Sequence, residues 1–441
     1  MQSKSLNFPK PHAVFTASTI VFSIVFSLTS DVTSQQEATP LSPVEQKQYE
    51  QIQDRLKKHD ELLRFSRHEL YSSKDEKKRE CDESTANILR PFYDSRQIPQ
   101  LVATGGIEAV RNIVAGLLKN EDPIIRGHGA LVLAILGDFG HKQDIAKLIV
   151  NMRDPPPKGF DMHSYYYDRG HAAIALGIMR AHEYAPRLAE ILQDPRSPIR
   201  ADAALGLGFM GAKDYTNNIA KLLSDSNRDD VCRAAMMALV ELDATEYAKE
   251  IADMLRSEGD INIPEMAFDS LVRLNAKNQT KALAAMLDHE YFKGKAAKTL
   301  ALLEAKDYKK EIAMLINDQS PSVKCDALIA LGILDAREYV KNVAEHLHDP
   351  ADYVRPFAAV ALLLMENKKP SRDYADEIRL ILTNESLMPA DGPGTVEYFE
   401  RFVCLRPPVT LREKQLGLRA AEVWRGINQP DDPDRGDRRE K

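Results

Sequence analysis

The order of apolar and polar residues along the chain repeats with a period near 31 residues. Two segments, 169–194 and 200–225, show the same succession of features: a basic residue, a run rich in alanine and leucine, a tyrosine, and an aliphatic stretch that ends before an aspartate. Leu176 and Leu207 stand at equivalent points of the two segments, 31 residues apart. A repeat of this length indicates stacked copies of one supersecondary unit, so it decides the fold class before any other feature.

The repeat extends in both directions from these two segments. Each copy has a leucine eight residues before the tyrosine position, which we use as the marker leucine; in the last copy Tyr374 follows its marker after a small insertion. The marker leucines are Leu133, Leu176, Leu207, Leu239, Leu271, Leu300, Leu331 and Leu362. Successive markers are separated by 43, 31, 32, 32, 29, 31 and 31 residues. An aliphatic residue follows the tyrosine position by four residues in nearly every copy, so the register predicts about eight repeats.

Each copy has the pattern of two amphipathic helices. The first helix is rich in alanine and leucine, and its small residues allow a neighbouring helix to approach closely. The second has apolar residues at i, i+3 and i+4, as in Ile219, Leu222 and Leu223. Because a pair of such helices cannot bury its apolar faces alone, the copies must stack. We therefore predict an all-α fold, a right-handed α-α superhelix (solenoid) of about eight helical hairpins with N- and C-terminal capping helices.

The first helix carries the motif of a known family. Residues 169–177 read Arg-Gly-His-Ala-Ala-Ile-Ala-Leu-Gly. This motif resembles the short, roughly 30-residue bacterial type of HEAT-like repeat, and the repeat is also similar to that of phycobilin lyases. The resemblance covers about residues 104–383. It implies a helical solenoid, and it says little about function, because the repeat alone does not carry lyase activity.

The regions outside the repeats have different compositions. Residues 1–34 combine Lys4 and Lys10 with an uncharged run and small residues before Gln35, which predicts an export signal and a periplasmic or extracellular location. An uncleaved membrane anchor and a cytosolic tail remain as alternatives.

We divide the rest of the chain into four further segments by composition and register. They are a linker and N-terminal helical region at 35–103, the HEAT-like solenoid at 104–383, C-terminal capping helices at 384–428, and a disordered tail at 429–441. The N-terminal region should include a polar helix from Val44 to about Tyr71, and the C-terminal region should include a helix from Leu411 to Ile427.

Charge and cysteine content limit the partners and crosslinks. The formal charge is −7 and 28% of residues are charged, with both signs interspersed, which argues against a nucleic-acid partner. Cys232 and Cys325 belong to copies three repeats apart, which places them about 25–30 Å apart, whereas a disulfide needs Cα atoms within about 7 Å. We predict that both are small buried residues of first helices. The states of Cys81 and Cys404 stay open.

One long gap between markers points to a candidate binding loop. About 12 residues are inserted between Leu148 and Arg169, and the insertion contains three successive prolines. Insertions in repeat arrays form loops on one face, often the binding face. The candidate binding residues of the 151–168 insertion are Phe160, His163, Tyr165, Tyr166 and Tyr167. In the alternative interpretation, the loop folds its tyrosines against the flank of the solenoid.

Two histidines form the strongest candidate for chemistry. His128 and His171 each stand two residues after the basic residue of their copies, so stacking should bring them together. A metal site completed by Asp168 or His163 is one interpretation, and polar residues at helix starts are the other. The position resembles that of the His-Glu pairs in HEAT-repeat deoxyhypusine hydroxylases, but no glutamate follows either histidine here. We predict no catalytic residue and no cofactor.

Aspartates and basic residues form a second regular pattern. Asp194, Asp318 and Asp349 stand six residues before Arg200, Lys324 and Arg355. We expect these aspartates to cap helices and to pair with basic residues of the stack, which is a structural role.

The sequence therefore favours a non-enzymatic scaffold that binds a protein partner. We expect the partner to contact a concave face lined by the second helices, the 151–168 insertion, or both. The expected exposed positions carry mixed charges: Arg187, Glu190, Asn217, Asn218, Lys221, Lys249, Glu250, Asp253, Lys341 and Glu345. The alternative is a metal-binding or enzymatic module centred on His128 and His171. No membrane contact is expected beyond an uncleaved N-terminal anchor.

Overall fold

The structure is a computed structural model, and it describes eleven segments of the chain. They are residues 43–58, 107–120, 123–150, 167–195, 197–224, 229–257, 261–365, 372–384, 399–400, 402–403 and 410–428. These residues form α-helices, one-turn 3-10 helices and turns, and none of them lies in a β-strand. The fold is all-α, as predicted. The predicted export signal and the predicted disordered tail lie outside the described residues.

The chain divides into two compact units, Met1–Ile219 and Ala220–Lys441. The N-terminal unit contains α2 (Pro43–Lys58), α6 (Ile107–Leu117), α7 (Pro123–Leu136), α8 (Lys142–Val150), α10 (Tyr167–Ile178), α11 (Ala185–Ile191) and α12 (Ser197–Met210), and α13 (Thr216–Ala220) ends at the boundary. The C-terminal unit contains α14 (Asp229–Glu241), α15 (Ala248–Asp253), α16 (Asn262–Arg273), α17 (Thr280–Ala284), α18 (Lys293–Leu302), α19 (Lys309–Met314), α20 (Pro321–Ile333), α21 (Val340–Glu345), α22 (Arg355–Met365), α23 (Arg372–Asn384) and α25 (Leu411–Asn428). No described helix is both long enough and apolar enough to cross a membrane.

The predicted register is the register of the core. All the marker leucines, from Leu133 to Leu362, have 0% exposed surface. The aliphatic residues four positions after the tyrosine position are equally buried, from Ile145 to Val343. The tyrosine position itself ends a 3-10 turn, as in His182–Tyr184 and Arg337–Tyr339, and the second helix follows directly. Each copy is therefore the helical hairpin that the periodicity predicts.

Small residues bring the first helices of neighbouring hairpins into backbone contact. A Cβ atom added to Gly206 would lie 2.5 Å from the carbonyl oxygen of Ala173, and one added to Gly177 would lie 2.3 Å from the carbonyl oxygen of Gly206. In the C-terminal unit, a Cβ atom added to Gly332 would lie 2.9 Å from the Cα of Ala361. Only glycine allows helices to pack at this distance.

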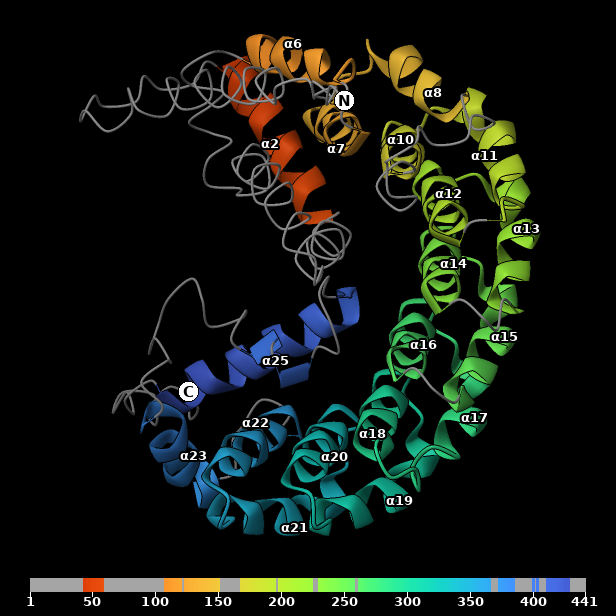
Figure 1. Cartoon of the computed structure of the whole chain (residues 1–441). Coiled ribbons are helices and arrows are strands. Elements are labelled where there is room, and N and C mark those ends of the chain that lie inside the picture. The colour runs from red at the N-terminus through yellow and green to blue at the C-terminus, as the bar shows by residue number, and fades with distance from the viewer. Residues whose placement is uncertain are drawn as a thin grey trace, which may run out of the picture. The chain divides into compact units, whose positions relative to one another are not determined.

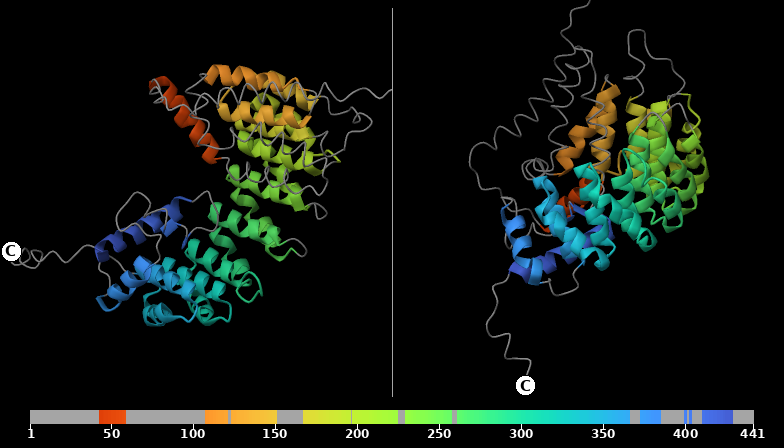
Figure 2. Two further views of the ribbon diagram at one scale, coloured as in Figure 1. Left: turned by 60° about the vertical axis from the view of Figure 1, so that its left-hand side comes forward. Right: turned by 90° about the horizontal axis from the view of Figure 1, so that it is seen from below.

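This close packing decides which helices line the inner side of each stack. Within each unit the first helices form one row and the second helices form another (Figures 1 and 2). The row of first helices is the more closely spaced, so it lies on the inner side, as α18, α20 and α22 do in the C-terminal unit (Figure 1). The expectation that second helices line the concave side is therefore wrong.

The turn between the two helices of a hairpin has the same backbone in every copy from the first to the seventh. The residue four positions after the marker leucine, which we call the turn residue, has a positive φ. The turn residues are Gly137, Arg180, Gly211, Asp243, Asn275, Glu304 and Asp335. The next residue donates its backbone N–H to the carbonyl of the marker leucine, as Ala181 does to Leu176 at 3.0 Å. This is a Schellman motif, which satisfies the last carbonyls of the first helix.

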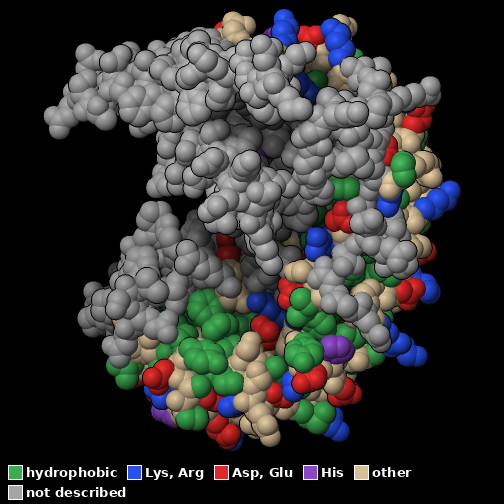
Figure 3. Space-filling model, viewed as in Figure 1, with side chains coloured by type: hydrophobic (Ala, Val, Ile, Leu, Met, Phe, Trp, Pro, Cys, Tyr) green, Lys and Arg blue, Asp and Glu red, His purple; other side chains and the backbone are tan. Residues whose placement is uncertain are grey.

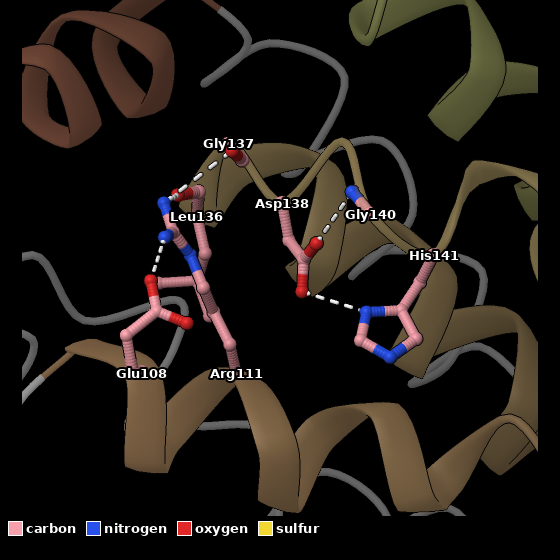
Figure 4. Close-up of polar contacts among 7 residues, drawn as sticks. All are labelled: Glu108, Arg111, Leu136, Gly137, Asp138, Gly140 and His141. Atoms are coloured by element: carbon pink, nitrogen blue, oxygen red, sulfur yellow. Dashed lines mark hydrogen bonds and ion pairs between the residues drawn. The ribbon is translucent and has the colours of Figure 1, made fainter.

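Side chains reinforce the first of these turns (Figure 4). Arg111 of α6 donates through Nη2 to the carbonyl oxygens of Leu136, at 2.7 Å, and Gly137, at 3.3 Å. Asp138 accepts the backbone N–H of Gly140 through Oδ1 at 2.9 Å, and its Oδ2 lies 2.8 Å from Nδ1 of His141. A cation near the end of a helix also interacts favourably with the helix dipole.

Helix α2 is attached to the same turn. Arg55 donates through Nε to the carbonyl oxygen of Ile135 at 2.6 Å. Its guanidinium occupies the space beside Gly137, where an added Cβ atom would lie 2.6 Å from Nη2. Ile52, one turn earlier in α2, is fully buried. Helix α2 thus packs on α7 through one apolar side chain and one arginine at the helix end.

Helix α25 packs on α22 and α23 at the other end of the chain. It begins with a capping box, in which the N–H of Thr410 binds Oε2 of Glu413 at 2.7 Å and the N–H of Glu413 binds Oγ1 of Thr410 at 3.2 Å. Arg379 of α23 donates to the carbonyl oxygen of Ile427 at 2.6 Å. The helix buries Trp424 completely.

The two described cysteines match their predicted role. Cys232 of α14 and Cys325 of α20 are buried and carry thiols rather than a disulfide. Burial, with smaller contributions from Asp326 and Asp349, raises the pKa of Cys325 to about 12. Cys81 and Cys404 lie outside the described residues.

Candidate functional site

Two buried histidines face each other between α7 and α10. The ring centroids of His128 and His171 are 5.0 Å apart, with 51° between the ring planes. His128 is 0% exposed and His171 is 4% exposed. The predicted adjacency is therefore correct, and it follows directly from the register, because both residues stand five positions before a marker leucine.

Asp168 is engaged by an arginine of the neighbouring copy. Its Oδ2 accepts from Nε and Nη2 of Arg126, at 2.9 and 2.7 Å. Arg126 also donates through Nη1 to the carbonyl oxygen of Asn120 at 2.8 Å. The carboxylate and the guanidinium thus form a two-pronged ion pair with a largely buried aspartate.

Asp202 of α12 completes the cluster. A Cβ atom added to Gly170 would lie 1.7 Å from Oδ2 of Asp202, so the glycine before His171 makes room for this carboxylate. We call Arg126, His128, Asp168, Arg169, His171 and Asp202 the histidine cluster. Its two guanidinium groups and two carboxylates balance each other, and the imidazoles add no charge when they are neutral.

Burial controls protonation in the histidine cluster. It lowers the pKa of His128 well below its usual value, and the neighbouring His171 lowers it further. His128 is therefore neutral in the folded protein at neutral pH. Because the unfolded chain takes up this proton near pH 6.5 and the folded chain does not, His128 contributes stability above that pH, which is lost as the pH falls below it. Burial raises the pKa of Asp168 more than Arg126 lowers it.

The described residues do not gather a metal-binding donor set. No group of three or more His, Cys, Asp or Glu side chains among them is placed to hold a metal ion. Two imidazoles would need a third donor, and Asp168 directs Oδ2 to Arg126. His163, the other candidate ligand, lies outside the described residues. The metal site therefore stays an alternative to a buried ion-pair network.

The same helix position carries charge in the C-terminal unit, which sequence reasoning missed. Lys295 and Asp326 also stand five residues before a marker leucine. Nζ of Lys295 lies 3.4 Å from Asp269 and 3.5 Å from Glu265 of α16. Burial raises the pKa of Asp326, and Lys298 and then Lys295 oppose this effect. A comparison of the copies could have found these residues, because a polar residue at this position departs from the apolar pattern of the other first helices.

The aspartate and basic pattern has the predicted structural role, with a different pairing. Asp318 and Asp349 cap the following segment, since their Oδ1 atoms accept the N–H of Ser320 at 2.8 Å and of Ala351 at 2.9 Å. Each pairs with the lysine near the start of its own copy: Asp318 with Lys293, and Asp349 with Lys324 at 3.0 Å.

The arginine six residues after the aspartate bonds to backbone instead. Arg200 donates to the carbonyl oxygen of Asp194 at 2.7 Å, and Arg355 donates to that of Asp349 at 2.8 Å. The same bond joins Arg126 to the carbonyl oxygen of Asn120. The loop at Asp349 is therefore fixed both to the copy before it, through Lys324, and to the copy after it, through Arg355.

Comparison with known proteins agrees with this arrangement of helices. Residues 158–240 match the HEAT repeats family. The chain therefore contains HEAT-like repeats. A search of curated proteins gives no match.

Three solved structures are similar to this chain. One is the complex of CpcE and CpcF of phycocyanin lyase from Nostoc sp., with 17% identity over 62% of this chain and 94% of that chain and a TM-score of 0.29. Another is human deoxyhypusine hydroxylase in complex with glycerol, with 18% identity over 60% and 98% of the two chains and a TM-score of 0.26. The third is a mutant of Kap121p, with 12% identity over 83% and 46% of the two chains and a TM-score of 0.37.

The predicted binding loop lies mainly outside the described residues. This applies to Phe160, His163, Tyr165 and Tyr166, while Tyr167 is the first residue of α10. Their role in binding stays a prediction. The end of the loop nevertheless has a defined register, since Tyr167 stands nine residues before the marker Leu176.

Exposed apolar side chains occur near this register in the C-terminal unit. Ile261, Tyr291 and Tyr353 are 54%, 72% and 55% exposed, and they stand nine or ten residues before their marker leucines. We call these three residues the inter-repeat edge, because they lie just before the first helices α16, α18 and α22. Hydrophobic side chains lie among charges of both signs on the face of this unit in Figure 3.

Proposed function

We propose that this protein is an exported, non-enzymatic scaffold that binds a protein partner through its inter-repeat edge, and that the tyrosines of the 151–168 insertion form a second, separate binding surface. The observation that carries the proposal is the exposure of Ile261, Tyr291 and Tyr353, nine or ten residues before their marker leucines. Large aromatic side chains provide much of the binding energy of protein interfaces once a partner excludes water from them.

The loop that carries Tyr353 is held by side-chain contacts to the copies on both sides of it. Beside Tyr353, Asp349 accepts the N–H of Ala351, pairs with Lys324, and receives Arg355 on its carbonyl oxygen. A fixed loop loses little conformational entropy on binding, which favours affinity. The mixed-charge positions on the second helices are largely exposed as well, but several pair within their own helix, such as Lys249 with Asp253 at 2.9 Å.

The edge is tested by replacing both of its tyrosines. Tyr291→Ser with Tyr353→Ser should change the free energy of unfolding by no more than about 0.5 kcal/mol, because the side chains are exposed. It should weaken capture of the partner at least tenfold, which corresponds to about 1.4 kcal/mol. Leu411→Ser, at an exposed position of α25, is the matched control and should retain the partner. Undiminished capture by the double variant would place the binding surface elsewhere.

The insertion is tested in the same assay. Changing Tyr165, Tyr166 and Tyr167 to Ser should weaken capture at least tenfold, about 1.4 kcal/mol, and leave the melting temperature nearly unchanged. A fall of many degrees would show that these tyrosines pack against the repeats.

Export is tested by the N-terminus of the mature protein. Cleavage of residues 1–34 should give a secreted or periplasmic chain that begins at Gln35. A chain in that fraction that still begins at Met1 would favour the uncleaved anchor, and a cytosolic chain would contradict export.

A metal-binding or enzymatic module at His128 and His171 is the second candidate, supported by their 5.0 Å separation. Elemental analysis of the purified protein separates it from the scaffold. A stoichiometric metal that disappears in His128→Asn, with the fold retained, would favour this candidate.

A further inference from the structure

The arginines of α25 match the spacing of the repeats beneath them. Arg412 pairs with Glu304, and Nη2 of Arg419 lies 3.7 Å from Oδ1 of Asp335. The two arginines are seven residues apart, which is about 10.5 Å along a helix. Glu304 and Asp335 are the turn residues of successive copies, and stacked helices lie about 8–10 Å apart. One helix can therefore place a cation on each of two consecutive turns.

The apolar side of α25 lies next to this row of arginines. Leu416, Ala420, Trp424 and Ile427 are buried where α25 packs on α22 and α23. The outer side carries Leu411, Lys414, Leu418 and Arg425, all exposed. We call Glu304, Asp335 and the face of α22 beneath α25 the docking strip. This strip is an apolar surface bordered by two carboxylates, whose separation matches two turns of the helix that lies on it.

The fit of α25 to the docking strip is incomplete. Both ion pairs are roughly one-third exposed or more on each side, so water and salt weaken them. Glu304 also pairs with Lys277, and Asp335 with Arg337 at 3.0 Å. The indole Nε1 of Trp424 is buried and has no hydrogen-bond acceptor among the described residues. A buried indole N–H usually has a partner.

We propose that the docking strip is a binding site for a basic amphipathic helix of a protein partner, and that α25 occupies it until the partner displaces it. The structure of α25 defines the partner helix: two cationic residues seven positions apart at the border of an apolar face that carries a large side chain. This surface is separate from the inter-repeat edge, so either proposal can fail without the other.

The test uses the full chain and a fluorescent synthetic peptide of residues 410–428 as the probe. Arg412→Glu with Arg419→Glu places carboxylates next to Glu304 and Asp335. The repulsion between these like charges should release α25 from the strip. We expect this variant to bind the peptide at least tenfold more tightly than the unchanged chain. Lys414→Glu with Arg425→Glu makes the same change of charge on the outer side of α25, and it should bind the peptide no better than the unchanged chain.

A charge reversal of the strip separates docking from general destabilisation. Glu304→Lys with Asp335→Lys should not bind the original peptide, and it should bind a peptide that carries both arginine-to-glutamate changes. Circular dichroism of each variant checks that the helices remain.

Two results would overturn the proposal. If the folded arginine variant and the folded strip variant bind neither peptide, α25 is a permanent cap. If the arginine variant instead forms a concentration-dependent dimer in analytical ultracentrifugation and excludes the peptide, the occupant is a second copy of this chain.

Discussion

The first and last described helices, α2 and α25, are anchored at the same position of the repeat by different chemistry. In the N-terminal unit, Arg55 of α2 donates to the carbonyl oxygen of Ile135 and occupies the space beside the turn residue Gly137. In the C-terminal unit, Arg412 of α25 pairs with the side chain of the turn residue Glu304. Where the turn residue lacks a side chain, the arginine reaches the backbone, and where it is acidic, the arginine meets the carboxylate.

This difference shows which of the two helices can be displaced from its turn. The contact of α2 depends on the shape of the turn, and the carbonyl it uses does not titrate. The contact of α25 depends on charge: Lys277 and Arg412 lower the pKa of Glu304 to about 2. Salt, pH or a competing cation therefore acts on α25 and leaves α2 in place.

The largest expected effect comes from breaking the core that positions the turns. Leu207 is fully buried, and its carbonyl oxygen accepts the N–H of Ala212 in the turn. Leu207→Ala should lower the free energy of unfolding by about 2–5 kcal/mol, because it leaves a cavity inside the stack. Urea unfolding measures the loss. A loss below about 1 kcal/mol, comparable to that of the exposed Leu411→Ala, would mean that the register is wrong.

A smaller effect is expected where α2 meets its turn. Gly137→Ala places a Cβ atom against Arg55 and also forces an L-residue to a φ of 70°. It should cost about 2–3 kcal/mol, of which the left-handed backbone accounts for about 1–2. Gly211→Ala is the matched control, since its φ is 76° and nothing lies within 4 Å of the added Cβ atom. Equal losses in the two variants would show that Arg55 does not depend on the space beside Gly137.

Salt should distinguish the two anchors. Arg55→Ala should cost about 1.5 kcal/mol at any salt concentration, because a charged group donates to a partly buried carbonyl. Arg412→Ala should cost no more than about 1 kcal/mol at low salt and almost nothing at 1 M salt, because its ion pair is exposed. Denaturant titrations at both salt concentrations measure this. The same salt response in both variants would contradict the conclusion that α2 is held by the shape of its turn and α25 by charge.

The smallest effect concerns pH. The folded-state pKa of Glu304, about 2, lies below its ordinary value of 4.5, so the group stabilises the fold fully above pH 4.5. That contribution is lost as the pH falls from 4.5 towards 2. Because the side chain is 45% exposed, we expect less than about 1 kcal/mol. The acid slope of stability should flatten in Glu304→Gln, and an unchanged slope would contradict the assignment.

The sequence predicts the hairpins because their core residues are alike in every copy. Leucine at the marker position and an aliphatic residue in the second helix recur from Leu133 to Val343, and burial selects both. The left-handed turn could not be predicted in the same way. Its residues include Arg180 and Glu304, which seldom adopt a positive φ, and the backbone hydrogen bonds that hold the turn leave no trace in residue type.

Only those parts of the site that follow from the register of the repeat could be predicted. The register places His128 beside His171, but the partner of Asp168 depends on how neighbouring copies are offset. The insertion puts 42 residues between Arg126 and Asp168, whereas Lys324 precedes Asp349 by 25. The inner position of the first helices was missed because curvature follows from the backbone approach at Gly206, which hydrophobic periodicity does not measure.

Because Cys325 is buried, its thiol can report how fast the C-terminal unit opens locally. Only a thiolate reacts with an alkylating reagent, and a pKa of about 12 leaves almost none at neutral pH while α20 is packed. The rate of labelling at Cys325 is therefore set by the opening of the repeat that contains it, in the way that amide hydrogen exchange reports local unfolding. Mass spectrometry of the labelled chain would time that opening in the unmodified protein, without any engineered probe.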